Sequence, residues 1–247
     1  MNATNWKTDA ENLLRQVDPG LCSPVYLVGM DEIGTAPGNA VGCWSPLFDL
    51  QLREIFRQQN RWAGRGFCCL VDATGTKDRF QNAGIPAADI RRRILATVVH
   101  EFAHYVDARP LLPESDVDAI LATSAEPSKL LAMPITVGEA TEKDPPWKGH
   151  DGARFGRLCI HLWHRSIMAG ETFHINDVYS PADFYWLSSP LEYVEALGDE
   201  PSERAAEPLR EIVNSQPPAD YAEFCRRDLE DASARLCAKS QQHFPKE

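Results

Sequence analysis

Short apolar segments and segments of helical period alternate in the first third of the chain. The stretches SPVYLVGM (23–30) and GFCCLVDA (66–73) are apolar runs of strand length, bounded by Gly, Pro and Asp. Between them, residues 45–62 repeat apolar side chains at helical spacing, at Leu47, Leu50, Leu52, Ile55 and Phe56. This pattern predicts a β, α, β beginning and a small mixed N-terminal sheet.

A longer helix is predicted from about Ala87 to Asp107. Pro86 suits the first turn, and the acidic Asp89 suits the positive end of the helix dipole. At about 100° per residue, one stripe of this helix is polar and the opposite side is apolar. The polar stripe comprises Arg93, Thr97, His100, His104 and Asp107, and the apolar side comprises Ile94, Val98, Val99, Phe102 and Val106. We expect the apolar side to pack on the sheet and the two imidazoles to point the same way.

The second half of the chain has a different pattern of apolar residues and prolines. Residues 110–146 are rich in proline and read as an excursion, whereas residues 149–170 resume a clear helical period that ends at Gly170. The remainder is helical in pattern with proline-containing joints. The expected fold class is α+β, with a core over residues 1–180 and a helical C-terminal part, residues 181–247, packed on it.

Composition and charge narrow the classes of partner. The chain has 247 residues, 43% of them hydrophobic, and a net charge of −11, which disfavours attraction to a phosphate backbone, so we expect no nucleic-acid partner. No basic-then-apolar leader and no apolar run of about 18 residues is found, so we expect no membrane span. The seven cysteines form no CxxC pair, and we expect a cytoplasmic protein with reduced thiols.

The sequence HEFAH within the predicted helix has the spacing of a zinc site. His100 and His104 lie one turn apart, and a helix supplies two neutral imidazoles from such positions without strain. Glu101 lies about 80–100° around the helix, so it can reach a water molecule at the metal rather than the metal itself. This arrangement predicts one Zn²⁺ per chain, with Glu101 as the general base of a hydrolysis.

A catalytic zinc needs a third protein ligand, and three sources remain open. Our preferred ligand is His150, which opens the next strong helical segment. The second source is a carboxylate, Glu192 or Glu195, in the segment SSPLEYVEALGDE. The third source is a thiolate, Cys68 or Cys69, on the strand that precedes the helix.

Other polar residues are candidates for supporting roles. Asp107, one turn beyond His104, suits the orientation of a ligand or of a neighbouring arginine. Arg154, Tyr179 and Tyr185 are each eligible to stabilise the oxyanion of a tetrahedral intermediate. His161 lies near a stripe that also holds Arg154, and it reads as a polar residue hydrogen-bonded within the fold.

HEFAH followed by W..H.G..F resembles the zincin metalloproteases, and most of all the SprT-like group. The resemblance covers residues 91–107 and 147–165, and it implies that His100, His104 and His150 are the zinc ligands and Glu101 the catalytic glutamate. The chain departs from the group in its longer gap between the motifs, in the Asp151 that separates the histidine from the glycine, and in the absence of a cysteine-rich ribbon. HEFAHYVD also resembles gluzincin helices, in which a downstream glutamate is the third ligand.

The expected activity is hydrolysis of peptide bonds in peptide or protein substrates by a zinc-dependent peptidase with a zincin-like fold. Two alternatives remain open: an inactive or metal-stabilised zincin-like interaction protein, which binds its metal through four protein ligands, and an amide hydrolase that does not act on peptides.

Overall fold

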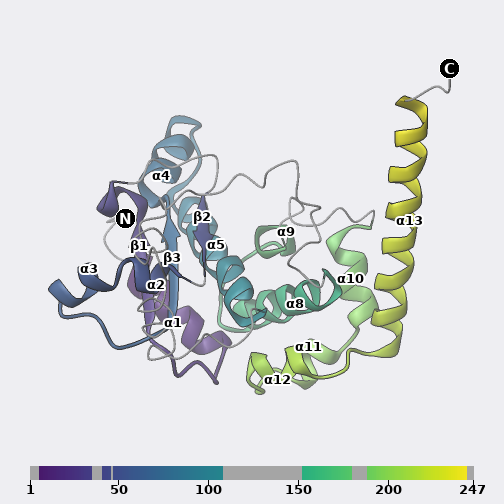
Figure 1. The fold of residues 1–247 in the computed structure, drawn as a ribbon, viewed down its shortest axis with the longest axis horizontal. Coiled ribbons are helices and arrows are strands. Elements are labelled where there is room, and N and C mark those ends of the chain that lie inside the picture. The colour runs from purple at the N-terminus through teal and green to yellow at the C-terminus, as the bar shows by residue number, and fades with distance from the viewer. Residues whose placement is uncertain (1–5, 35–40, 46, 108–151, 180–187, 244–247) are drawn as a thin grey trace, which may run out of the picture.

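The computed structural model describes residues 6–34, 41–45, 47–107, 152–179 and 188–243. Within these ranges the protein is an α+β structure, mostly helical, with eleven α-helices and one three-stranded sheet (Figure 1). The elements, in chain order, are α1 (Trp6–Val17), β1 (Val25–Gly29), the 3-10 helix η2 (Met30–Ile33), β2 (Gly42–Trp44), α2 (Phe48–Gln51), α3 (Arg53–Gln58), β3 (Phe67–Val71), α4 (Ala73–Asn82), α5 (Ala87–Asp107), α8 (Gly152–Met168), α9 (Ile175–Val178), α10 (Pro190–Leu197), α11 (Glu200–Glu203), α12 (Leu209–Asn214) and α13 (Ala219–His243). The expected α+β class is confirmed.

The sheet is small and mixed. Its strand order is β1-β3-β2, with β1 parallel to β3 and β2 antiparallel to β3. The two predicted strands are β1 and β3, while β2 was not predicted because its three residues are too few to form a recognisable apolar run. Because β3 is the central strand, β2 lies at one edge of the sheet.

The predicted helix over residues 45–62 is two short helices, α2 and α3, that meet at Leu52. Asp49 in α2 is buried and forms an ion pair with Arg65 at 2.7 Å, and it also accepts a hydrogen bond from the backbone N–H of Gly66 at 3.0 Å. These contacts attach α2 to the chain just before β3. The apolar side chains of α2 and α3 form a second, smaller core on the face of the sheet opposite α5.

Helix α5 has the predicted bounds and lies at the centre of the molecule (Figure 1). One side packs on the sheet, where Phe102 meets the ring of Phe67 edge-on at 5.3 Å. Helices α1, α4, α8, α9 and α12 also contact α5, so most of its side chains are buried. The polar stripe is exposed at Arg93 and becomes buried towards His100. His100 is therefore the most buried residue of that stripe, and His104 is half-buried.

The C-terminal helices α10 to α13 lie on the α8 side of the molecule, away from the sheet (Figure 1). Helices α10, α11 and α12 contact α8 directly, and α13 contacts α10. No helix in the described part of the chain is both long enough and apolar enough to cross a membrane.

Candidate functional site

The imidazole of His100 has a fixed orientation. Its Nδ1 lies 2.8 Å from the carbonyl oxygen of Val178. Val178 is the last residue of α9, so its carbonyl has no partner within that helix. A carbonyl oxygen only accepts hydrogen bonds, so Nδ1 carries the proton and Nε2 of neutral His100 carries a lone pair. This is the tautomer that binds a metal through Nε2.

The imidazole of His104 directs its Nε2 atom towards the Nε2 atom of His100. Nε2 of His104 lies 3.2 Å from Nε2 of His100. Two nitrogens that each lie about 2.0–2.1 Å from one tetrahedral zinc are about 3.3–3.4 Å apart. The pair therefore fits a shared zinc ion. The same distance fits a hydrogen bond from His104 to His100, and metal content distinguishes the two arrangements.

Glu101 lies between α5 and the edge strand β2. It is 8% exposed, and a Cβ added at Gly42 would lie 3.7 Å from its Cγ and 2.5 Å from Cγ2 of Thr97. The strand can approach this turn of α5 so closely because residue 42 has no side chain. On the same strand, burial and the charge of Glu101 raise the pKa of the Cys43 thiol to about 12. Cys43 therefore stays a neutral thiol beside the carboxylate.

An aromatic ring from α8 covers the histidine pair. Phe155 is fully buried and stacks on His104, with ring centroids 4.5 Å apart and planes 20° apart. The same ring meets His100 edge-on at 5.8 Å. The W..H.G..F pattern contains this phenylalanine, but sequence reasoning gave it no role.

Asp107 and Arg154 are partners. Their side chains approach to 2.7 Å, and Arg154 also donates to the backbone oxygen of Asp107 at 2.7 Å. The pair joins the end of α5 to the start of α8. The contact is of the kind expected for Asp107 beside a neighbouring arginine, and the role of Arg154 at an oxyanion stays a prediction.

The candidates for a third ligand lie in different parts of the chain. His150 lies outside the described residues, as does the oxyanion candidate Tyr185. Glu192 and Glu195 are exposed on α10, where the side chain of Glu192 accepts from the backbone N–H of Ser189 at 3.4 Å. Among the residues that the structure describes, no group of three or more His, Cys, Asp or Glu side chains is arranged to hold a metal ion.

The remaining candidates are buried. Cys68 and Cys69 lie on β3, and burial raises the pKa of both thiols well above the ordinary value. Tyr179 directly follows Val178, but its ring lies in the core against Gly156 of α8 and near Tyr193 of α10. Burial raises the pKa of Tyr179, which keeps its hydroxyl neutral.

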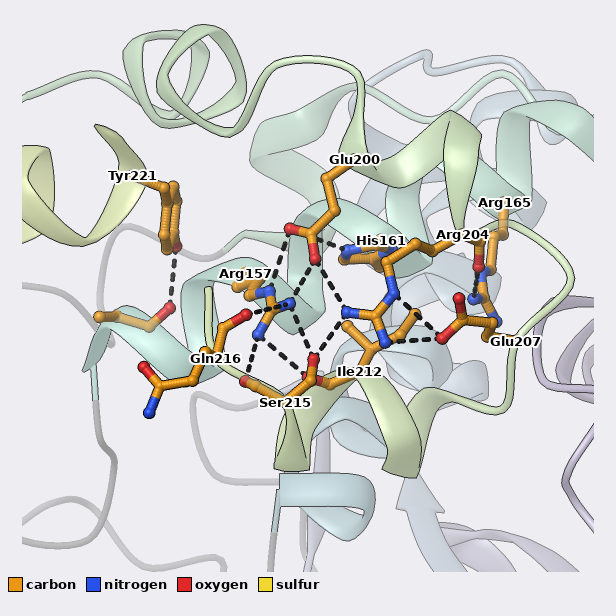
Figure 2. Close-up of polar contacts among 11 residues, drawn as sticks. Arg157, His161, Arg165, Glu200, Arg204, Glu207, Ile212, Ser215, Gln216 and Tyr221 are labelled. Carbon is orange, nitrogen blue, oxygen red and sulfur yellow. Dashed lines mark hydrogen bonds and ion pairs between the residues drawn. The ribbon is translucent and has the colours of Figure 1, made fainter. Parts of the chain in front are cut away.

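A buried charge network holds α8 in place (Figure 2). Arg157, 3% exposed, forms a two-pronged ion pair with Glu200 of α11. Arg157 also donates to the backbone oxygens of Ile212 at 3.0 Å and Ser215 at 2.9 Å. One arginine thus connects α8 to α11 and to the end of α12. Sequence reasoning missed this network, since Glu200 has no motif around it.

Glu200 has two further neighbours, His161 and Arg204. Arg204 donates to its carboxylate at 3.1 Å, and Nε2 of the fully buried His161 lies 3.6 Å from it. Burial opposes the charge of Glu200, but His161 and Arg157 outweigh that penalty and lower the pKa of Glu200 to about 2. Burial lowers the pKa of His161 below its ordinary 6.5. At neutral pH the network therefore contains a charged carboxylate and a neutral imidazole.

This network predicts a loss of stability in acid. Below about pH 6.5 the unfolded chain protonates His161 while the folded chain resists, so the free energy of unfolding falls as the pH drops. The contribution of Glu200 is complete above its ordinary pKa of 4.5 and is lost as the pH falls towards 2. Urea unfolding midpoints between about pH 5 and pH 7 test the first part. We expect His161→Gln to flatten this dependence and the same change at the exposed His174 to leave it intact; an unaltered slope in His161→Gln contradicts the prediction.

Comparisons with known proteins assign no family. No protein-family model, no curated protein and no solved structure matches the chain. The geometry around His100 and His104 is therefore the basis for a functional proposal.

Proposed function

We propose that the chain is a zinc-dependent peptidase with a zincin-like core. The observation that carries the proposal is the convergence of the two Nε2 atoms of His100 and His104 at 3.2 Å, with the tautomer of His100 fixed by Val178. A structural histidine does not require this arrangement, whereas a pair of metal ligands does. The HExxH spacing and the burial of Glu101 beside the pair support the same conclusion.

Each residue has a distinct role in this proposal. His100, His104 and His150 would hold the metal, and Glu101 would act as the general base. Zinc, when bound, supplies Lewis acidity and lowers the pKa of water towards 7. The Glu101 carboxylate would accept a proton from the attacking water and pass it to the leaving nitrogen of the scissile amide. Asp107 and Arg154 would keep α5 and α8 together around the site.

The edge strand β2 suits a peptide or protein substrate. It pairs with β3 on one side only within the sheet, and it runs beside the turn of α5 that carries Glu101. An extended peptide can add to such an edge through backbone hydrogen bonds. The proposal also places the protein in the cytoplasm, where the six cysteines whose side chains the structure describes would remain thiols.

Metal content per chain, measured by mass spectrometry on protein purified without chelator, tests the proposal. We expect about one zinc in the native chain. The content should be much lower in His104→Ala and in His150→Ala. It should be unchanged in the control His174→Ala, which changes an exposed histidine outside the site. A native chain that takes up no metal contradicts the proposal and leaves a plain His–His hydrogen bond.

Three further outcomes would redirect the proposal. Undiminished zinc in His150→Ala would move the third ligand to Glu192 or Glu195, and Ala variants of these two would be measured next. Tight binding of zinc by four protein ligands, together with no hydrolysis of casein-like substrates, would favour an inactive interaction protein. Faster cleavage of small amides than of proteins would favour an amide hydrolase that does not act on peptides.

A further inference from the structure

Phe155 contacts both members of the histidine pair. It stacks on His104 at 4.5 Å and meets His100 edge-on at 5.8 Å, and it is fully buried. The two imidazoles are themselves nearly perpendicular, at 88°. The three rings thus form one packed group where the polar stripe of α5 meets α8.

We propose that Phe155 is a positioning residue that holds the imidazole of His104 in the rotation that aims its Nε2 at the position shared with His100. This inference rests on the proposed metal site. His100 is oriented by its hydrogen bond to Val178, whereas the face of the His104 ring lies on the face of Phe155. A rotation of His104 about its Cβ–Cγ bond would drive the imidazole edge into the phenyl ring, which is buried and has no space to yield.

The position of Phe155 is itself fixed from both sides along α8. On the preceding residue, Arg154 binds Asp107 at the end of α5. Two residues further on, Arg157 binds Glu200 in the buried charge network (Figure 2). Between them, Gly156 allows two tyrosine rings to close on α8, since a Cβ there would lie 3.2 Å from atoms of both Tyr179 and Tyr221. The phenyl ring is therefore a rigid surface for His104.

The ring also affects the environment of the site. An apolar ring keeps water away from one side of the two imidazoles, and a low local dielectric strengthens the interaction between a metal cation and its ligands. Loss of the ring should therefore weaken metal binding in two ways, through freer rotation of His104 and through entry of water.

Zinc affinity, measured by competition with a chromophoric chelator, tests the inference on the full chain. We expect Phe155→Ala to weaken zinc binding about 10- to 100-fold, the usual cost of losing the support of a metal ligand. Phe155→Leu keeps apolar volume but offers no flat face, and we expect an intermediate loss. The matched control is Phe102→Ala, which removes an equally buried ring from the sheet side of α5. It should destabilise the fold without changing the zinc affinity of the folded chain. All affinities are measured below the melting temperature of each variant.

The visible spectrum of cobalt-loaded protein provides a second measurement, because it reports ligand geometry rather than activity. We expect altered bands in Phe155→Ala and native bands in Phe102→Ala. Native zinc affinity and native cobalt bands in Phe155→Ala would overturn the inference while leaving the metal site intact. A native chain without metal would instead remove the proposed function. If Phe155→Ala does not fold, Phe155→Leu decides by the same two measurements.

Discussion

Replacement of Glu101 by Gln is expected to abolish turnover while zinc remains bound. Gln has nearly the same shape as Glu, so it fits the buried position between α5 and β2 without displacing either element. It cannot accept the proton of the attacking water, and general base catalysis typically contributes about 10²- to 10⁴-fold to the rate. We therefore expect a loss of at least this size in kcat on a casein-like substrate, with metal content near the native value.

The control for this variant is Glu223→Gln, which changes an exposed carboxylate on α13 and should leave both metal and turnover unchanged. The key comparison is between activity and metal content in the same preparation. Full hydrolysis by Glu101→Gln would exclude this residue as the base. A loss of zinc together with activity would show that Glu101 supports the metal rather than the proton transfer.

The largest effect on stability is expected at Glu200. In Glu200→Ala the guanidinium of Arg157 stays buried without its carboxylate, and removing one partner of a buried ion pair costs roughly 3–5 kcal/mol. The backbone oxygens of Ile212 and Ser215 still accept from Arg157, but they cannot neutralise its charge. We expect the free energy of unfolding, from urea titration at neutral pH, to fall by this amount.

Glu207→Gln is the matched control, because Glu207 pairs with Arg204 at the exposed rim of the same network. Exposed ion pairs contribute little to stability, so we expect a near-native unfolding midpoint. Equal stability of Glu200→Ala and Glu207→Gln would contradict the assignment of Glu200 as the buried anchor of α8.

The parts of the fold that were predictable have strong local signals. Helix α5 combines a long apolar period with Pro86 at its start, and its predicted bounds match the structure. Strands β1 and β3 are uninterrupted apolar runs between turn residues. The spacing of His100 and His104 predicted that they face the same way, and in the structure their Nε2 atoms are neighbours.

The rest depended on contacts between distant residues. Strand β2 is three residues long and exists through its pairing with β3. Nδ1 of His100 lies against the backbone carbonyl of Val178. Every residue has such a carbonyl, so the sequence does not show which one His100 will meet. In the sequence, Phe155 cannot be distinguished from the other apolar residues of an amphipathic helix, and Glu200 cannot be distinguished from other acidic residues. Their roles follow from the tertiary packing of α8, which sequence periodicity does not specify.

The distance along the chain between His100 and its partner has a consequence for biosynthesis. The carbonyl of Val178 follows His100 by 78 residues. At roughly 5–20 residues per second, a ribosome needs roughly 4–16 seconds to make that interval. During this time the nascent chain already contains both histidines of α5 but lacks the group that sets the tautomer of the first. If the chain binds zinc as proposed, the tautomer of His100 would therefore be fixed only after translation has passed Val178, long after the HEFAH segment itself has been made.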